Sequence, residues 1–183
     1  MNIPRTLVLC TLVLLGLTAC LPGSSTEPAS EPASDALQLP RPSQASEISL
    51  EEALVRRRSV REYDHYSLTP SEIGQLLWAA QGVTDERGYR TAPSAGALYP
   101  LEIYVATVDG VYHYVPRGHH LRTVAYGDVR SALYEAALRQ EPVRSAPAVF
   151  LISALFERTA RKYGQERSPR YVYLETGHAA QNL

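Results

Sequence analysis

The sequence predicts an α+β domain. Predicted helices and strands alternate along residues 49–183, as they do in layered domains of mixed structure. A two-residue turn at Asp109-Gly110 joins two β-rich runs, so at least part of the sheet is expected to be antiparallel. With 183 residues, of which 45% are hydrophobic and 20% charged, the chain has the length and composition of one globular domain.

Two capped helices are expected at the start of this domain. Ser49 to Glu52 has capping-box spacing and predicts a helix through about Arg57. Thr69 to Glu72 is a second capping box, with Pro70 at the first helical position. Apolar residues then recur at helical period until Gly82, which is expected to end the helix.

The rest of the domain is expected to alternate between strands and helices. Runs rich in β-branched, aromatic or other apolar residues predict strands over 101–108, 111–115 and 148–155. Helices are expected over 128–139, capped by Asp128, and from Ser168 to Leu183. The chain stops inside this last predicted helix without a cap, which predicts that the domain is truncated.

The N-terminus has the pattern of an export signal. Arg5 precedes an apolar run over 7–17 that is too short to span a bilayer comfortably. The run leads into Leu17-Thr18-Ala19-Cys20, which resembles a lipobox, so we expect a lipoprotein signal peptide over 1–19 and lipidation of Cys20. The predicted location is therefore the bacterial cell envelope, with an ordinary secretory signal as the alternative.

A linker and a folded domain are expected to follow the signal. Residues 20–47 are rich in Pro, Ser, Ala and Glu, and such a stretch buries too little apolar surface to offset its ordering entropy. We therefore predict a disordered tether over 20–47 and a domain over 48–183.

Several functional classes receive no support. The formal net charge of −1 gives no overall attraction to nucleic acid. Cys10 and Cys20 are the two cysteines, so no thiolate metal site is expected in the domain. The five histidines show no metal-binding pattern, and His119-His120 is expected to lie in a surface loop. No phosphate-binding P-loop or Rossmann glycine motif is present.

Two segments have residue types suited to a flat, phosphorylated ligand. Residues 56–61 cluster guanidinium groups and a hydroxyl at a helix end, which suits an anion, although these residues alone favour a solvated basic patch. Residues 92–100 place small residues between two prolines, where backbone can approach a flat ring closely. An ordinary turn into a strand is the alternative for the second segment.

Taken together, three segments resemble the nitroreductase superfamily, and within it the SagB-type thiazoline/oxazoline dehydrogenases. They are Arg-Arg-Ser-Val-Arg-Glu-Tyr (57–63), Ala-Pro-Ser-Ala-Gly-Ala-Leu-Tyr-Pro (92–100) and Glu-x-Gly-His-x-x-Gln-Asn-Leu (175–183). The resemblance covers about residues 50–183. It implies a mostly antiparallel sheet flanked by helices, a homodimer, and FMN bound at the dimer interface. The family domain continues past the last helix, so this chain is expected to be incomplete.

The resemblance also implies roles for individual residues. Arg57, Arg58 and Ser59 would hold the FMN phosphate and ribityl chain, and Arg61 would lie near the flavin or its hydride donor. The remaining flavin contacts would come from Pro93, Ser94, Ala95, Gly96, Gln181 and Asn182. Ala97 stands where many nitroreductases have Asn, which favours the SagB branch.

Lys162 and Tyr163 resemble the Lys-Tyr pair of the azoline dehydrogenases. Either side chain could take a proton while the flavin takes a hydride, and an exposed basic loop is the alternative. The expected function is an FMN-dependent oxidoreductase that accepts hydride from NAD(P)H or directly from a heterocycle. Its substrate would be a small molecule or an azoline-containing peptide. A lipid-anchored binding or scaffold module that keeps the fold without turnover is the second hypothesis.

Overall fold

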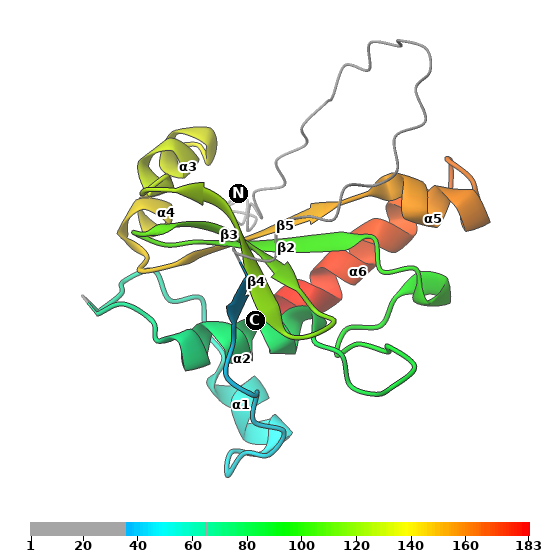
Figure 1. The fold of residues 1–183 in the computed structure, drawn as a ribbon, viewed down its shortest axis with the longest axis horizontal. Helices are drawn as coiled ribbons and strands as arrows, with labels where there is room; N and C mark the ends of the chain where they lie inside the picture. Colours follow the sequence, from blue (N-terminus) through cyan, green and yellow to red (C-terminus); the bar gives the residue numbers. More distant parts are fainter. Residues whose placement is uncertain (1–35, 65) are drawn as a thin grey trace, which may run out of the picture.

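The structure is a computed structural model that describes residues 36–64 and 66–183. The predicted signal peptide, Cys20 and most of the predicted tether therefore lie outside the described residues. The described part consists of one sheet with helices packed on it and at its ends (Figure 1).

All five strands of the sheet pair in antiparallel fashion, in the order β1-β4-β3-β2-β5. This arrangement confirms the predicted α+β class, with a fully antiparallel sheet. The strands are β1 (Ala36–Gln38), β2 (Leu101–Ala106), β3 (Gly110–Val115), β4 (His120–Tyr126) and β5 (Val149–Ala154).

The helices fall between and around these strands. The Ser49 and Thr69 caps are both present, and Thr69 forms the full capping box with Glu72. The helices are α1 (Leu50–Arg56), α2 (Pro70–Gln81), the 3-10 turn η1 (Ala95–Ala97), α3 (Arg130–Ala136), α4 (Glu141–Ser145), α5 (Phe156–Tyr163) and α6 (Ser168–Asn182). Among residues 36–64 and 66–183, none of these helices is long and apolar enough to cross a membrane.

Two strands lie where none was predicted. His120 begins β4, so the expectation of a surface loop at His119-His120 is wrong for His120. In β4 Leu121 alone is buried, so the strand lacks the apolar alternation by which a strand is recognised. The strand β1 lies inside the predicted tether, and Leu39 directly after it is buried in the core. The folded part therefore begins before residue 48.

Helices α2 and α6 cover the same face of the sheet. Leu101, Ile103 and Val105 alternate along β2 and point to one side. Leu101 clusters with Val172 of α6, whereas Ile103 and Val105 cluster with Leu77 of α2. Both helices therefore pack against the same face of β2.

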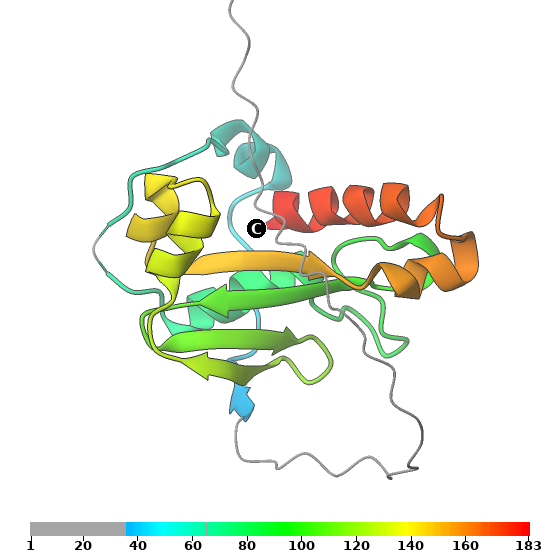
Figure 2. The same ribbon diagram turned by 90° about the horizontal axis from the view of Figure 1, so that it is seen from above.

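The long axis of α6 separates two regions of the molecule. Figure 2 shows η1 and α5 at the N-terminal end of α6, while α1 lies toward its C-terminal end. The loop that carries η1 and the segment that follows α1 are therefore at opposite ends of the same helix.

Candidate active site

The loop over residues 92–100 has an unusual backbone. Gly96 has φ of 62°, and Ala97 and Tyr99 have φ of 54° and 46°. Left-handed backbone is costly for residues with a Cβ, at about 1–3 kcal/mol each, and is kept where surrounding contacts impose it. Three left-handed residues within four positions therefore give this loop a sharply bent backbone.

Two side chains from α5 reach this loop. A Cβ placed on Gly96 would lie 2.8 Å from Lys162 Nζ and 3.0 Å from the Tyr163 hydroxyl. The amine and the phenol therefore converge on the one position of the loop that has no side chain. Both residues lie in the last turn of a helix and not in a loop, with Lys162 exposed and Tyr163 half-buried.

Aromatic contacts hold the α5 pair in place. The Tyr163 and Tyr171 rings are 4.6 Å apart, which ties the end of α5 to α6. Lys162 Nζ lies 5.6 Å from the centre of the Tyr163 ring, within the range of a cation–π contact. An amine and a phenol are thus presented on helical backbone next to the small-residue loop.

The loop is anchored from within by Tyr99. The Tyr99 N–H donates to Ser94 Oγ at 2.9 Å, which closes the loop on itself. The Arg90 N–H donates to the Tyr99 hydroxyl at 3.2 Å, and the Arg90 guanidinium lies 4.4 Å above the Tyr99 ring. Burial lowers the pKa of Arg90, and the charges of nearby acidic groups, Glu102 and Glu175 among them, oppose that shift.

A second anchor reaches the loop from Arg158 of α5. Arg158 Nη1 donates to the Tyr99 carbonyl at 3.0 Å, and Arg158 Nη2 pairs with Glu102 at 2.5 Å. Glu102 also contacts His113 Nε2 at 2.6 Å. Burial alone would raise the pKa of Glu102, but His113 and Arg158 outweigh it and lower the pKa. Within the described chain, no group of three or more His, Cys, Asp or Glu could hold a metal ion.

The predicted phosphate-binding residues lie elsewhere. Arg57, Arg58, Ser59 and Arg61 are all exposed on the segment after α1. Arg58 Nη1 donates to the carbonyls of residues 55 and 57, so this side chain folds back on the end of α1. The structure therefore does not bring these four residues to the 92–100 loop within one chain (Figure 2).

The remaining predicted contacts divide between the two regions. Pro93 and Gly96 are exposed on the loop, and Ser94 and Ala95 are half-buried there. Gln181 and Asn182 are exposed at the C-terminal end of α6, on the side toward α1. The predicted cofactor contacts thus form two groups, here called the two halves of the site. The half formed by the 92–100 loop lies at the N-terminal end of α6, and the half formed by residues 57–61 with Gln181 and Asn182 lies at its C-terminal end.

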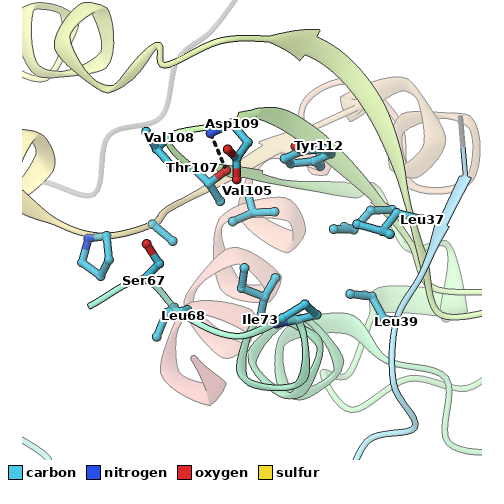
Figure 3. A pocket seen from close by; sticks show the side chains of 14 residues that line it. Leu37, Leu39, Ser67, Leu68, Ile73, Val105, Thr107, Val108, Asp109 and Tyr112 are labelled. Carbon is cyan, nitrogen blue, oxygen red and sulfur yellow. Dashed lines mark hydrogen bonds between the residues drawn. The ribbon is translucent and has the colours of Figure 1, made fainter. Parts of the chain in front are cut away.

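An apolar cavity of about 200 Å³ lies away from both halves. Figure 3 shows Leu37, Leu39, Ile73 and Val105 around it, with Asp109 at its polar side. The Asp109 N–H donates to the Thr107 hydroxyl at 3.2 Å, which fixes the β2–β3 turn beside the cavity. No predicted site residue lines this cavity.

Comparison with known proteins gives the family. The model of the nitroreductase family matches residues 54–183. The chain belongs to the nitroreductase family. The matched range runs from the last residues of α1 to the end of α6 and includes the four strands from β2 to β5, so it contains all the predicted cofactor-binding residues. Family membership supports an oxidoreductase-type role.

Individual nitroreductase-family relatives and solved structures agree with this. A protein of Methanocaldococcus jannaschii that bears the name nitroreductase is 49% identical over 153 residues, which cover 80% of this chain and 75% of that protein. The microcin B17-processing protein of Escherichia coli is 31% identical over 132 residues, 65% of this chain and 48% of the relative. A solved nitroreductase from Ralstonia eutropha superposes with a TM-score of 0.70 at 28% identity, over 87% of this chain and 74% of that one.

One solved neighbour is an assembly. The E. coli microcin synthetase complex, solved with a truncated microcin precursor bound, contains a chain that superposes with a TM-score of 0.56 at 27% identity. The match covers 78% of this chain and 59% of that one. The nitroreductase-family chain described here therefore spans under two thirds of its microcin-processing relatives.

Sequence reasoning missed the residues that shape the loop. Arg90, Tyr99, Arg158 and Gln81 lie outside the predicted helical face or in segments of no assigned role. Glu175 carried a usable signal, because it falls at a buried position of α6 between Val172 and Ala179. A charged residue on an apolar helical stripe indicates a buried partner.

Proposed function

We propose that this chain is an FMN-dependent oxidoreductase of the azoline dehydrogenase type. The observation that carries the proposal is the convergence of Lys162 Nζ and the Tyr163 hydroxyl on Gly96, at 2.8 and 3.0 Å from its absent Cβ. Because Gly96 has no side chain, the amine and the phenol lie against the backbone of a loop whose small residues suit the face of a flat ring. FMN would supply the hydride-accepting chemistry when bound.

The residues present fit FMN if two copies of the chain share the site. One copy offers the glycine-centred loop with Lys162 and Tyr163, while exposed guanidinium groups near α1 suit a phosphate. These features lie at opposite ends of α6, so a partner would bring the second half (Figure 2). Exposed Tyr173 and Leu174 on α6, together with exposed Leu54 on α1, give an apolar surface for that contact.

The proposed reaction breaks two C–H bonds of the azoline ring. Oxidation of an azoline to an azole removes a hydride from one ring carbon and a proton from its neighbour. The amine of Lys162 or the oxygen of Tyr163 would take the proton, and helical backbone would hold that acceptor at a fixed distance from the loop. NAD(P)H is the alternative hydride donor for reduction of nitro or quinone compounds.

The peptide class of substrate is supported by relatives. The trifolitoxin-processing protein of Rhizobium leguminosarum is 34% identical over 109 residues, which cover 54% of this chain and 29% of that protein. Its name, and that of the microcin B17-processing protein, refer to the processing of toxins and microcins. We propose an azoline-containing peptide as the substrate of this chain.

FMN titration of the wild type and of an Arg57→Ala/Arg58→Ala variant tests cofactor binding. Loss of charge-assisted hydrogen bonds to the phosphate should raise the FMN dissociation constant about tenfold or more. The matched control is Arg139→Ala/Arg144→Ala, which removes two exposed arginines near α3 and α4. Equal affinity in both variants would refute the assigned phosphate site, and a wild type that takes up no FMN would refute the proposal.

Anaerobic stopped-flow absorbance tests turnover. Mixing the FMN-loaded protein with an azoline peptide should bleach the flavin band, and Tyr163→Phe and Lys162→Met should slow the bleaching roughly 100-fold, as expected for loss of a general base. Bleaching by NADPH alone would favour nitro or quinone reduction. A protein that binds FMN but is reduced by neither would support the scaffold hypothesis.

We also propose that the chain is lipid-anchored in the cell envelope through Cys20, which lies outside the described residues. The proposal rests on the apolar run and the lipobox-like ending of the predicted signal. Membrane fractionation of the full chain should show loss of anchoring in Cys20→Ala and full retention in Cys10→Ala. Equal membrane association of the two variants would argue against lipidation.

A further inference from the structure

The loop that carries Gly96 rests on a buried carboxyl group. Glu175 is 2% exposed although it is ionisable, and it projects from the inner face of α6 between Val172 and Ala179. Gln81, at the end of α2, is 0% exposed. Buried polar side chains of this kind are retained where they bind specific partners.

Glu175 faces three groups from three different segments. The charge of Arg90 and the side chains of Ser94 and Gln81 all act to lower the pKa of Glu175, while burial raises it more strongly. Arg90 Nη1 donates to Gln81 Oε1 at 3.0 Å. Glu175 Oε1 and Gln81 Nε2 are both buried without a hydrogen bond of good geometry, so the cluster retains an acceptor and a donor.

Ser94 connects this cluster to the loop. Its Oγ accepts the Tyr99 N–H at 2.9 Å, so its own hydroxyl proton remains to be donated. Glu175 offers a buried acceptor, Oε1, that has no hydrogen-bond partner, and the Ser94 side chain lies close enough to this carboxyl group to lower its pKa. The inferred link runs from Glu175 through Ser94 to the Tyr99 N–H, across the loop that carries Gly96.

We propose that Glu175 is a positioning residue, which fixes the 96–99 segment through Ser94 and so sets where Gly96 meets Lys162 and Tyr163. A buried charged side chain adds little to the stability of a core, because a well-packed apolar side chain of the same shape stabilises the fold equally or more. A directed acceptor, by contrast, is needed where a hydroxyl must hold a loop in one conformation. Arg158 supplies the matching anchor on the sheet side.

Hydrogen exchange of the FMN-free protein tests the inference without any cofactor. Glu175→Gln keeps the size of the side chain and removes the charged acceptor, and Ser94→Ala removes the link. In both variants the Tyr99 amide should exchange about tenfold faster, as expected for a lost charge-assisted bond, while amides of β2 and β3 stay protected. Glu166→Gln, an exposed change near the start of α6, should leave all of these rates unchanged.

The double variant separates positioning from general stability. If Glu175 acts through Ser94, Glu175→Gln/Ser94→Ala should exchange at Tyr99 no faster than the single variants. Unchanged Tyr99 exchange in Glu175→Gln, additive effects in the double variant, or an equal rise across β2 and β3 would each overturn the inference.

The consequence for cofactor binding rests on the proposed function. Glu175→Gln should raise the FMN dissociation constant about tenfold, and Glu166→Gln should not change it. A wild type that binds no FMN would refute the proposed function and leave the exchange result standing. An FMN affinity unchanged in Glu175→Gln, with faster Tyr99 exchange, would show that the loop does not contact the flavin and would overturn the positioning role.

Discussion

Gly96 is the residue at which backbone conformation and site chemistry meet. Its φ of 62° favours glycine, and the absence of a side chain leaves the space that Lys162 Nζ and the Tyr163 hydroxyl approach. The sequence predicted Gly96 and its neighbours as a cofactor loop because small residues lie between two prolines. It did not predict the anchors Arg90 and Arg158, because their partners are brought together by tertiary packing.

Gly96→Ala should therefore affect the site more than the fold. An added Cβ imposes left-handed strain of about 1–2 kcal/mol and displaces the flexible end of Lys162. Urea unfolding should show that loss of stability, and FMN titration should show weakened binding. Gly127→Ala is the matched control, because Gly127 has φ of 90° and open space around it, so the control should lose similar stability and keep FMN affinity. Equal affinities would contradict a ligand at Gly96.

At the scale of elements, local capping signals predicted two helices well, whereas two neighbouring strands at one side of the sheet escaped prediction. Both capped helices begin where the sequence placed them. Strands β1 and β4 were missed because they bury almost nothing on their own and depend on each other's pairing. The helix predicted over 128–139 is the shorter α3, whose N-cap is Val129 and not Asp128. The helices α4 and α5 were missed, since short helices carry little periodic signal.

Removal of the α2 cap should destabilise the domain. Thr69 Oγ1 accepts the Glu72 N–H at 3.2 Å, and the Glu72 carboxylate accepts the Thr69 N–H at 2.7 Å. Thr69→Ala should lower the free energy of unfolding by about 1 kcal/mol, measured by urea denaturation. Thr69→Ser keeps the acceptor and should lie close to wild type, and equal losses in the two variants would argue against the cap.

His119 predicts a pH-dependent stability. Its Nε2 donates to the Pro40 carbonyl at 3.0 Å, so its Nδ1 accepts from the Tyr114 hydroxyl at 2.9 Å, and the neutral ring satisfies both. Burial lowers the pKa of His119 below its ordinary 6.5, against the effect of the Pro40 bond. Because the folded state favours the neutral ring, the stabilisation is present above pH 6.5 and is lost as pH falls through the folded pKa.

His119→Asn should remove this pH dependence. Asn tolerates the left-handed backbone at this position, where φ is 49°, and does not titrate. Loss of two hydrogen bonds should cost roughly 1–3 kcal/mol at pH 7.5. Urea unfolding at pH 7.5 and 5.5 should show a larger drop for wild type than for the variant. Parallel drops would assign the pH effect to other groups.

The whole molecule exposes an apolar surface on its two outer helices. Tyr173 and Leu174 of α6 are 64% and 56% exposed, and a Cβ on Gly177 would meet nothing within 4 Å. Within the described chain, Gly177 therefore lies on an open face of α6. The predicted halves of the site could be identified from motifs, but their separation along α6 follows from the fold and could not be read from spacing.

Leu174→Arg should therefore disrupt self-association. A charge in an apolar contact between copies is costly, so the variant should sediment as a monomer and bind FMN at least tenfold more weakly. Leu138→Arg, which changes a 76% exposed leucine after α3, is the control and should match wild type in both measurements. A Leu174→Arg protein that sediments like wild type would place the contact between copies elsewhere.

The strand β1 has a mechanical consequence. It is the first described element, and its three residues pair with Arg122, Leu121 and His120 of β4. The Gln38 amide and the His119 ring add side-chain ties across the same junction, to Gly118 and Pro40. Any pull that enters the domain through residue 36 is borne first by this short ladder. A force applied at residue 36 would separate β1 from β4 before it acts on α5 and α6. The conformation of the loop around Gly96 would therefore not change under such a force.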